Sequence, residues 1–207
     1  MFQQLIKKSI LIFLGCFLFF NFTVAQNWEV NWLNNINPDY PNSNFQINIS
    51  KSVYPFALAT PLTMLSVGFI KKDKKLQQQS FKIIGSLLIN TAITQGLKYT
   101  INRQRPYEAY PTIINPYTIE TDASFPSGHT STAFALATSI SLQNKKWYVV
   151  IPTFAWASSV SYSRMYLGEH YPTDVFAGAV IGIGSAYLSN WLNKKLFNYD
   201  DQKRNSK

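Results

Sequence analysis

The chain has 207 residues, of which 46% are hydrophobic, 15% aromatic and only 14% charged. Soluble domains carry about a quarter charged residues, so this composition is unusual for one. The formal net charge is +9, but the lysines gather in short clusters between long uncharged runs instead of along one face. This distribution argues against a nucleic-acid partner. The length suits one domain with a sizeable core.

Residues 1–25 are typical of a secretory signal peptide or a first membrane helix. Lys7-Lys8 gives a basic start, Ser9 to Phe20 is almost wholly apolar, and Thr23-Val24-Ala25 resembles a small-residue cleavage site. An uncleaved membrane helix is the alternative. The apolar run continues past Cys16, which argues against a lipidated cysteine, and cleavage would leave the mature chain without cysteine.

Residues 26–51 are polar and rich in asparagine, with Pro38 and Pro41 among them. We interpret this extracytoplasmic segment as an external loop or short surface helices, and no catalytic pattern shows in it. Residues 198–207 form a polar tail.

Five runs of the chain contain no Asp, Glu, Lys or Arg. They are Ser52–Ile70, Ile83–Leu97, Ala123–Asn144, Trp147–Ser163 and Val175–Asn193. A bilayer-spanning helix needs about 20 residues, so four runs qualify by length; the short second run is flanked by Lys82 and Lys98, which can snorkel. Small residues, as in Gly178-x-x-x-Gly182, suit close helix contact. We therefore expect an all-α bundle of five or six transmembrane helices over residues 52–197, although a soluble all-α protein has similar buried helices.

The lysine clusters give the expected orientation. Lys71-Lys72-Asp73-Lys74-Lys75, Lys145-Lys146 and Lys194-Lys195 follow alternate runs, and Lys7-Lys8 precedes the first. If each run spans the membrane, all four clusters fall on one side, as cytoplasmic loops do under the positive-inside rule. The sequence thus predicts a bacterial inner-membrane protein with residues 26–51, 98–122 and 164–174 facing the periplasm. A soluble periplasmic protein is the alternative.

One stretch, Ser163 to Asp174, combines groups that can carry out chemistry. His170 and Asp174 are four residues apart, so they share a face if the segment is helical. The carboxylate can then fix the imidazole tautomer and leave the second ring nitrogen free to attack, while Arg164 can hold an oxyanion in a bidentate grip. A plain surface pair is the alternative. With His129 as the only other histidine, and the single cysteine near the N-terminus, we expect no metal site.

A second basic stretch ends the Ile83–Leu97 run. Lys98 and Arg105 are seven residues apart, two helical turns, so they can converge on one anion before Pro106 ends the helix. Arg103 is off the shared face and fits a basic patch that touches anionic lipid.

A third stretch, Pro126-Ser127-Gly128-His129, is typical of a helix start. Unpaired N–H groups there form a ready anion site, and Gly128 allows close approach. His129 would stand beside the anion, where it can give a proton to a departing oxygen.

In this order, Lys98-x6-Arg105-Pro106, Pro126-Ser127-Gly128-His129 and Ser163-Arg164-x5-His170-x3-Asp174 resemble the three-part signature of the type 2 phosphatidic acid phosphatase (PAP2) family. The resemblance implies a set of residues that bind the phosphate oxygens. They are Lys98, Arg105, Ser127, Gly128 and Arg164.

The resemblance also implies the catalytic roles. His170 attacks phosphorus to form a phosphohistidine and is held in place by Asp174. His129 protonates the leaving alkoxide and then activates the water that releases phosphate. Neither a metal nor another cofactor is needed.

We therefore expect a membrane phosphatase whose substrates are lipid phosphates or pyrophosphates. Phosphatidate, phosphatidylglycerol phosphate, isoprenoid pyrophosphate and lipid A phosphate all fit. The alternatives are a soluble periplasmic acid phosphatase, a vanadate-dependent haloperoxidase and a non-catalytic lipid- or anion-binding membrane protein. The intact His129, His170 and Asp174 argue against the last, since binding alone needs only the cations.

Overall fold

The computed structural model describes residues 22–205, and within this range every regular element is a helix. The predicted all-α fold is therefore confirmed. The predicted signal peptide or first membrane helix at 1–25 lies outside the described residues except for its last four, which begin helix α2.

Five long helices form the bundle and match the five charge-free runs. They are α4 (Val53–Ile70), α5 (Lys74–Ile101), α7 (Gly128–Gln143), α8 (Trp147–Tyr166) and α9 (Pro172–Asn205). Helix α7 packs against α5, α8 and α9, so it forms the centre of the bundle. Helix α5 is longer than its uncharged run because the Asp73 side chain caps it, accepting a hydrogen bond from Leu76 N at 3.0 Å.

The bundle is polar inside and apolar outside, the reverse of a soluble protein. Buried hydroxyl and amide side chains line its interior: Ser80, Asn90 and Thr94 of α5, Ser131 and Ser139 of α7, and Ser185 and Ser189 of α9. Large apolar side chains are exposed around it: Phe56, Leu62 and Phe69 of α4, Trp147 and Ile151 of α8, and Phe176, Tyr187 and Trp191 of α9. Interhelical hydrogen bonds between small polar groups, with an apolar exterior, are typical of membrane bundles.

Two of the described helical stretches, Asn44–Ile70 and Pro172–Lys195, are long and apolar enough to cross a bilayer. Of the other long helices, α7 has 16 residues and is too short for this criterion.

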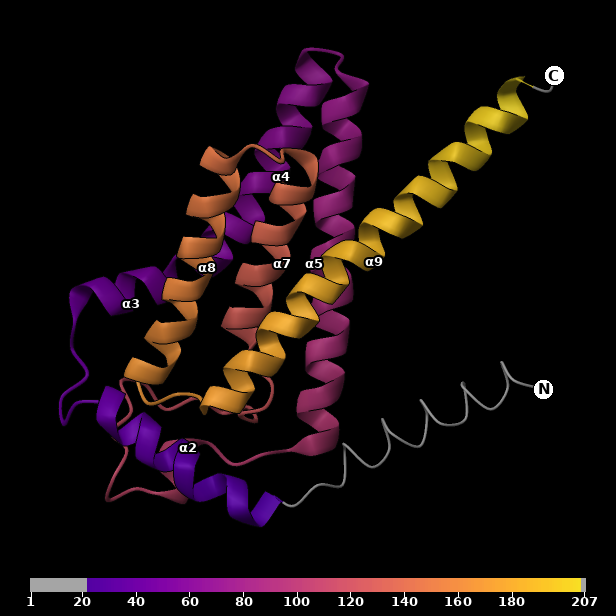
Figure 1. The fold of residues 1–207 in the computed structure, drawn as a ribbon. Helices are drawn as coiled ribbons and strands as arrows, with labels where there is room; N and C mark the ends of the chain where they lie inside the picture. Colours follow the sequence, from indigo (N-terminus) through magenta and orange to yellow (C-terminus); the bar gives the residue numbers. More distant parts are fainter. Residues whose placement is uncertain (1–21, 206–207) are drawn as a thin grey trace, which may run out of the picture.

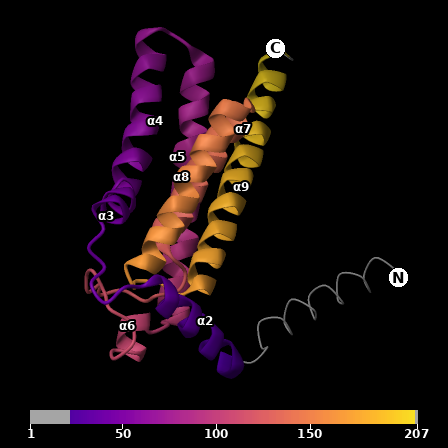
Figure 2. The ribbon, with the colours of Figure 1, turned by 60° about the vertical axis from the view of Figure 1, so that its left-hand side comes forward.

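The lysine-rich turns and the candidate site loops lie at opposite ends of the bundle (Figures 1 and 2). The α4–α5 turn, the α7–α8 turn and the C-terminal half of α9 lie at one end. The long connection between α5 and α7 and the short one between α8 and α9 lie at the other. The three lysine clusters that the structure describes thus lie at one end of the bundle, as expected, and Lys7-Lys8 lies outside the described residues.

The polar segment 26–51 consists largely of two helices, α2 (Phe22–Ile36) and α3 (Asn44–Lys51). Helix α2 crosses the loop end of the bundle, near the four-residue helix α6 (Pro106–Ala109) (Figure 2). Val30 and Leu33 of α2 are buried in a cluster with Tyr107, Met165 and Tyr171. The segment is therefore packed onto the end of the bundle that carries the candidate site.

Helices α7 and α9 approach so closely that Gly182 has no room for a side chain. A Cβ there would overlap the Ser131 carbonyl oxygen and lie 2.8 Å from Ala135 N, whereas a Cβ at Gly184 meets nothing within 4 Å. Gly182→Ala should therefore destabilise the fold by about 1–3 kcal/mol through overpacking. Thermal unfolding in detergent measures this, with Gly184→Ala as the control; equal melting temperatures for the two variants would contradict the close contact.

Candidate active site

Three chain segments far apart in sequence meet at the loop end of the bundle. They are the end of α5 with the turn after it, the start of α7, and the connection from α8 to α9. In the last of these, Gly168 adopts a φ of +72°, which L-residues other than glycine rarely take. A backbone hydrogen bond of 3.0 Å from Ser127 N to the Asp174 carbonyl joins the starts of α7 and α9.

His170 and Asp174 meet, but not on the face of one helix. Helix α9 begins at Pro172, so His170 precedes it. The Asp174 carboxylate turns back, accepts a hydrogen bond from Tyr171 N at 2.9 Å, and lies 3.7 Å from His170 Nδ1. The predicted pair is thus present, held by a tight turn. Among the described residues, none hydrogen-bonds the other ring nitrogen, Nε2.

Ser124 completes this pair and was not anticipated from the sequence. Its hydroxyl donates to Asp174 Oδ2 at 2.5 Å and lies 3.5 Å from His170 Nδ1. The hydroxyl therefore links the carboxylate to the imidazole.

The surroundings of His170 favour its neutral form. Complete burial, and then the positive charges of Arg105, Arg164 and Lys98, lower its pKa well below the usual value. A neutral imidazole keeps a lone pair available, so the same cations that can bind an anion also keep His170 nucleophilic.

Lys98, Arg105 and Arg164 are buried and converge on the same region. Lys98 and Arg105 do not share a helical face as expected, because α5 ends at Ile101 and Asn102 turns the chain with a φ of 46°. They meet instead across Asp122: Lys98 Nζ lies 3.0 Å from Asp122 Oδ2, and Arg105 pairs with Oδ1.

Two glutamates complete the balance of charge around the arginines. Buried Glu169 lies 3.4 Å from Arg105 and 3.5 Å from Arg164, and half-exposed Glu120 lies 3.5 Å from Arg164. Burial raises the pKa of Glu169, and the arginine charges oppose this shift. Glu169 therefore lies close to both arginines and bridges them.

The start of α7 faces the cations. Ser127 is the N-cap, and the N–H groups of Gly128 and His129 donate to no described residue. A Cβ at Gly128 would lie 3.9 Å from Lys98 Cε, so this helix start is directly beside the lysine. The His129 ring packs edge-on against Tyr54 at 4.8 Å, within electrostatic range of His170 and all three cations. All eight expected site residues thus lie together.

The expectation for Arg103 is wrong. Its guanidinium does not face lipid: Nη1 donates to Asp174 Oδ1 and Nη2 to Glu29 Oε2, both at 2.7 Å. Glu29 belongs to the segment in which no catalytic pattern was found. Its only sequence signal is that it is the one charged residue of α2.

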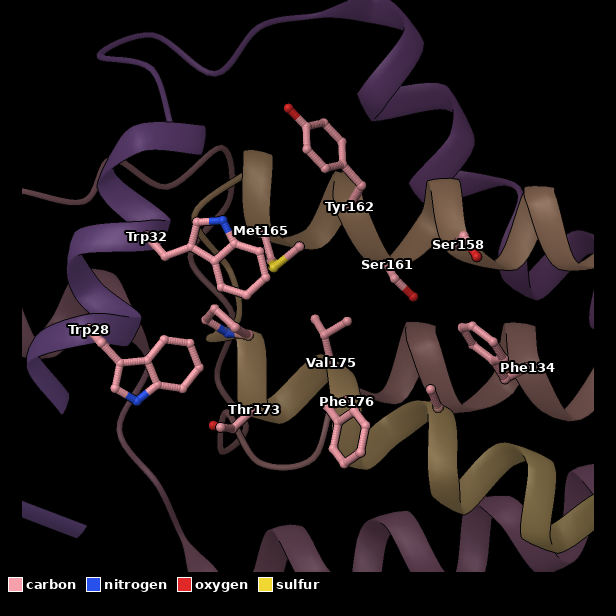
Figure 3. Close-up of a pocket in the computed structure, with 12 residues that line it drawn as sticks. Trp28, Trp32, Phe134, Ser158, Ser161, Tyr162, Met165, Thr173, Val175 and Phe176 are labelled. Carbon is pink, nitrogen blue, oxygen red and sulfur yellow. The ribbon is translucent and has the colours of Figure 1, made fainter. Parts of the chain in front are cut away.

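An apolar cavity of 540 Å³ is lined by residues of α2, α7, α8 and the start of α9 (Figure 3). Trp28 and Trp32 face Met165, Val175 and Phe176 across it. Neither histidine lines it, so it is distinct from the charged site.

Residues 79–197 match the PAP2 superfamily. The chain belongs to this superfamily. It is 33% identical to an undecaprenyl-diphosphatase of Sulfolobus acidocaldarius over 62% of this chain and 60% of the relative. It is 31% identical to a lipid A 1-phosphatase of Porphyromonas gingivalis over 72% of this chain and 31% of the relative.

Two solved structures share the fold. Aquifex aeolicus LpxE aligns with a TM-score of 0.58 and 27% identity, covering 77% of this chain and 91% of that one. A transmembrane PAP2-type phosphatidylglycerolphosphate phosphatase of Bacillus subtilis aligns with a TM-score of 0.69 and 22% identity, covering 90% and 94%.

The chain spans 60%, 44% and 32% of the first three curated relatives it matches. Together with the two apolar helices, these similarities indicate a membrane protein. In the part of the chain that the structure describes, no group of three His, Cys, Asp or Glu side chains is arranged to hold a metal ion.

Asp122 occupies the cations that an incoming anion needs. Although burial opposes it, the hydrogen bond and charge of Lys98, followed by those of Arg105, lower the pKa of Asp122 and so favour its charged form. Asp122→Asn should strengthen binding of inorganic phosphate by about two- to fivefold. Calorimetry measures this, with the exposed Asp39→Asn as a matched control. Weaker binding would show that Asp122 chiefly positions the cations.

Proposed function

We propose that this protein is a membrane phosphatase that hydrolyses lipid phosphates or pyrophosphates at the periplasmic face through a phosphohistidine. One observation carries the proposal: two imidazoles, three buried cations and a free helix start converge at one end of an apolar bundle. An anion-binding protein would need the cations but not the second histidine or the Asp174 contact.

Substrate binding uses the cations. A phosphate monoester carries up to two negative charges, and the three cations with the free N–H groups of Gly128 and His129 match them. As the phosphoryl group transfers, charge stays spread over its oxygens, so the same contacts stabilise the transition state.

The chemical step begins at His170. Its Nε2 forms a bond to phosphorus as the bond to the leaving oxygen breaks, and Asp174 stabilises the positive charge that develops at Nδ1–H. The negative charge of the bound phosphoryl group offsets the surrounding cations and favours a protonated His129, which then gives this proton to the leaving alkoxide. His129 then takes a proton from water, whose oxygen attacks phosphorus, breaks the P–N bond and releases inorganic phosphate with His170 restored.

The membrane position supports a lipid substrate. The site lies at the end of a bundle with an apolar exterior, which brings it to the level of lipid headgroups. The named relatives act on undecaprenyl diphosphate and lipid A, which are phosphorylated membrane lipids. The lysine-rich turns lie at the opposite end, so the positive-inside rule supports a periplasmic site.

The first test concerns the nucleophile. His170→Ala should lower phosphate release by at least about a thousandfold, because no group replaces the attacking nitrogen. Rates on vesicles containing phosphatidate or an isoprenyl pyrophosphate, and on soluble esters, also rank the substrates. In rapid-quench experiments the wild type should carry an acid-labile, alkali-stable phosphoryl label that the variant lacks. Turnover of the variant near the wild-type rate would refute the mechanism.

The second test concerns the general acid. His129→Ala should lower kcat/KM by about 10²–10⁴-fold with an alkyl phosphate. The loss should be much smaller with p-nitrophenyl phosphate, because p-nitrophenolate leaves without protonation. The ratio of the two kcat/KM losses is the measurement. Equal losses on both substrates would remove the general-acid role from His129.

A further inference from the structure

A buried chain of charges lies directly behind the His170–Asp174 pair. Asp174 Oδ1 accepts from Arg103 Nη1, and Arg103 Nη2 donates to Glu29, each at 2.7 Å. Glu29 is 2% exposed and Asp174 is fully buried. This chain of charges therefore begins on α2, outside the residues matched to the superfamily, and ends at the His170 imidazole.

Glu29 also holds the first turn of α9. Its Oε1 accepts from Thr173 N at 3.0 Å and from the Thr173 hydroxyl, and that hydroxyl accepts from Arg103 at 2.8 Å. A carboxylate at a helix start satisfies an unpaired N–H and interacts favourably with the helix dipole. The same side chain thus fixes the backbone that carries Asp174.

Arg103 has little freedom to move. Its guanidinium lies 3.8 Å from the centre of the Tyr171 ring, and its two terminal nitrogens are bonded to opposite carboxylates. Because Arg103 holds Oδ1 of Asp174, the other oxygen stays directed at Ser124, Tyr171 N and His170.

We propose that Glu29 and Arg103 are positioning residues for the phosphoryl transfer, and that α2 is therefore part of the working site. The inference rests on the proposed function. Asp174, Arg103 and Glu29 together carry a net charge of one negative unit, which stabilises the positive charge that develops on His170 during attack. If Glu29 is made neutral, the positive charge of Arg103 cancels the negative charge of Asp174, and the net charge that stabilises His170 is lost. The effect falls on the chemical step, because neither residue contacts Lys98, Arg105 or Arg164.

Docking of α2 does not depend on Glu29 alone. Val30 and Leu33 are buried against the bundle, and Asn37 donates to the carbonyls of Asn115 at 2.8 Å and Tyr166 at 2.9 Å. A change at Glu29 that keeps the side-chain volume thus alters the charge while α2 stays in place.

The test compares Glu29→Gln with Asp39→Asn, the same chemical change on an exposed carboxylate of the same segment, using the full chain in phosphatidate vesicles. Glu29→Gln should lower kcat by about ten- to a hundredfold, which is the loss seen at metal sites when a residue that orients a metal ligand by a hydrogen bond is removed. The KM and the inhibition constant of inorganic phosphate should stay within about twofold of wild type, and Asp39→Asn should match wild type throughout. A kcat for Glu29→Gln equal to that of Asp39→Asn overturns the inference. Phosphate inhibition that weakens in parallel with kcat also overturns it, because the pocket itself would then be damaged.

Arg103→Lys gives the same test if Glu29→Gln does not fold, since lysine keeps the charge but cannot bridge both carboxylates. It should lower kcat with unchanged phosphate inhibition. Where Glu29→Gln does fold, combining the two changes should lower kcat little further than either change alone, because the two residues act as one unit. Additive losses contradict the coupling. A wild-type chain without turnover of either phosphatidate or an isoprenyl pyrophosphate overturns the proposed function and the inference together, whereas an active wild type whose Glu29→Gln variant matches the control overturns the inference alone.

Discussion

Burial of three cations at one end of a bundle with an apolar exterior is the constraint on which the rest of the site depends. A lone buried charge is strongly unfavourable, so Lys98, Arg105 and Arg164 require partners that stay charged. Asp122 and Glu169 supply them directly in the absence of substrate. An incoming phosphate can replace exposed Asp122 as the partner of the cations, while buried Glu169 stays paired with the two arginines. The three cations are thus already in place for a dianion, and in the free protein Asp122 and Glu169 balance their charge.

The bundle keeps these groups in register. Hydroxyl and amide contacts join α5 to its neighbours, as between Thr94 and Ser131 at 3.1 Å, and Gly182 lets α7 and α9 touch. The two histidines stand near the starts of these two helices, and the Ser127–Asp174 backbone hydrogen bond joins the starts directly. A polar interior inside an apolar shell therefore serves both membrane stability and site geometry.

The helices and the three motifs were predictable because their signals are local. A run of about 20 residues without charge has few structural solutions, and each motif adjoins the end of such a run. The predictions that proved wrong, and the contacts that were missed, depend on tertiary structure. Asn102 adopts a left-handed conformation that ends α5, so Lys98 and Arg105 meet across Asp122 and Arg103 turns inward. Glu29 contacts the site only because α2 folds back across the bundle end, and no spacing in the sequence indicates that path.

Vanadate, which copies the five-coordinate phosphoryl group in transfer, tests the central claim most directly. An experimental structure of the protein with vanadate bound should show vanadium bonded to His170 Nε2. Its oxygens should lie against Lys98, Arg105, Arg164 and the start of α7, with His129 beside the oxygen opposite His170. Vanadate bonded to His129, or bound away from the three cations, would contradict the account.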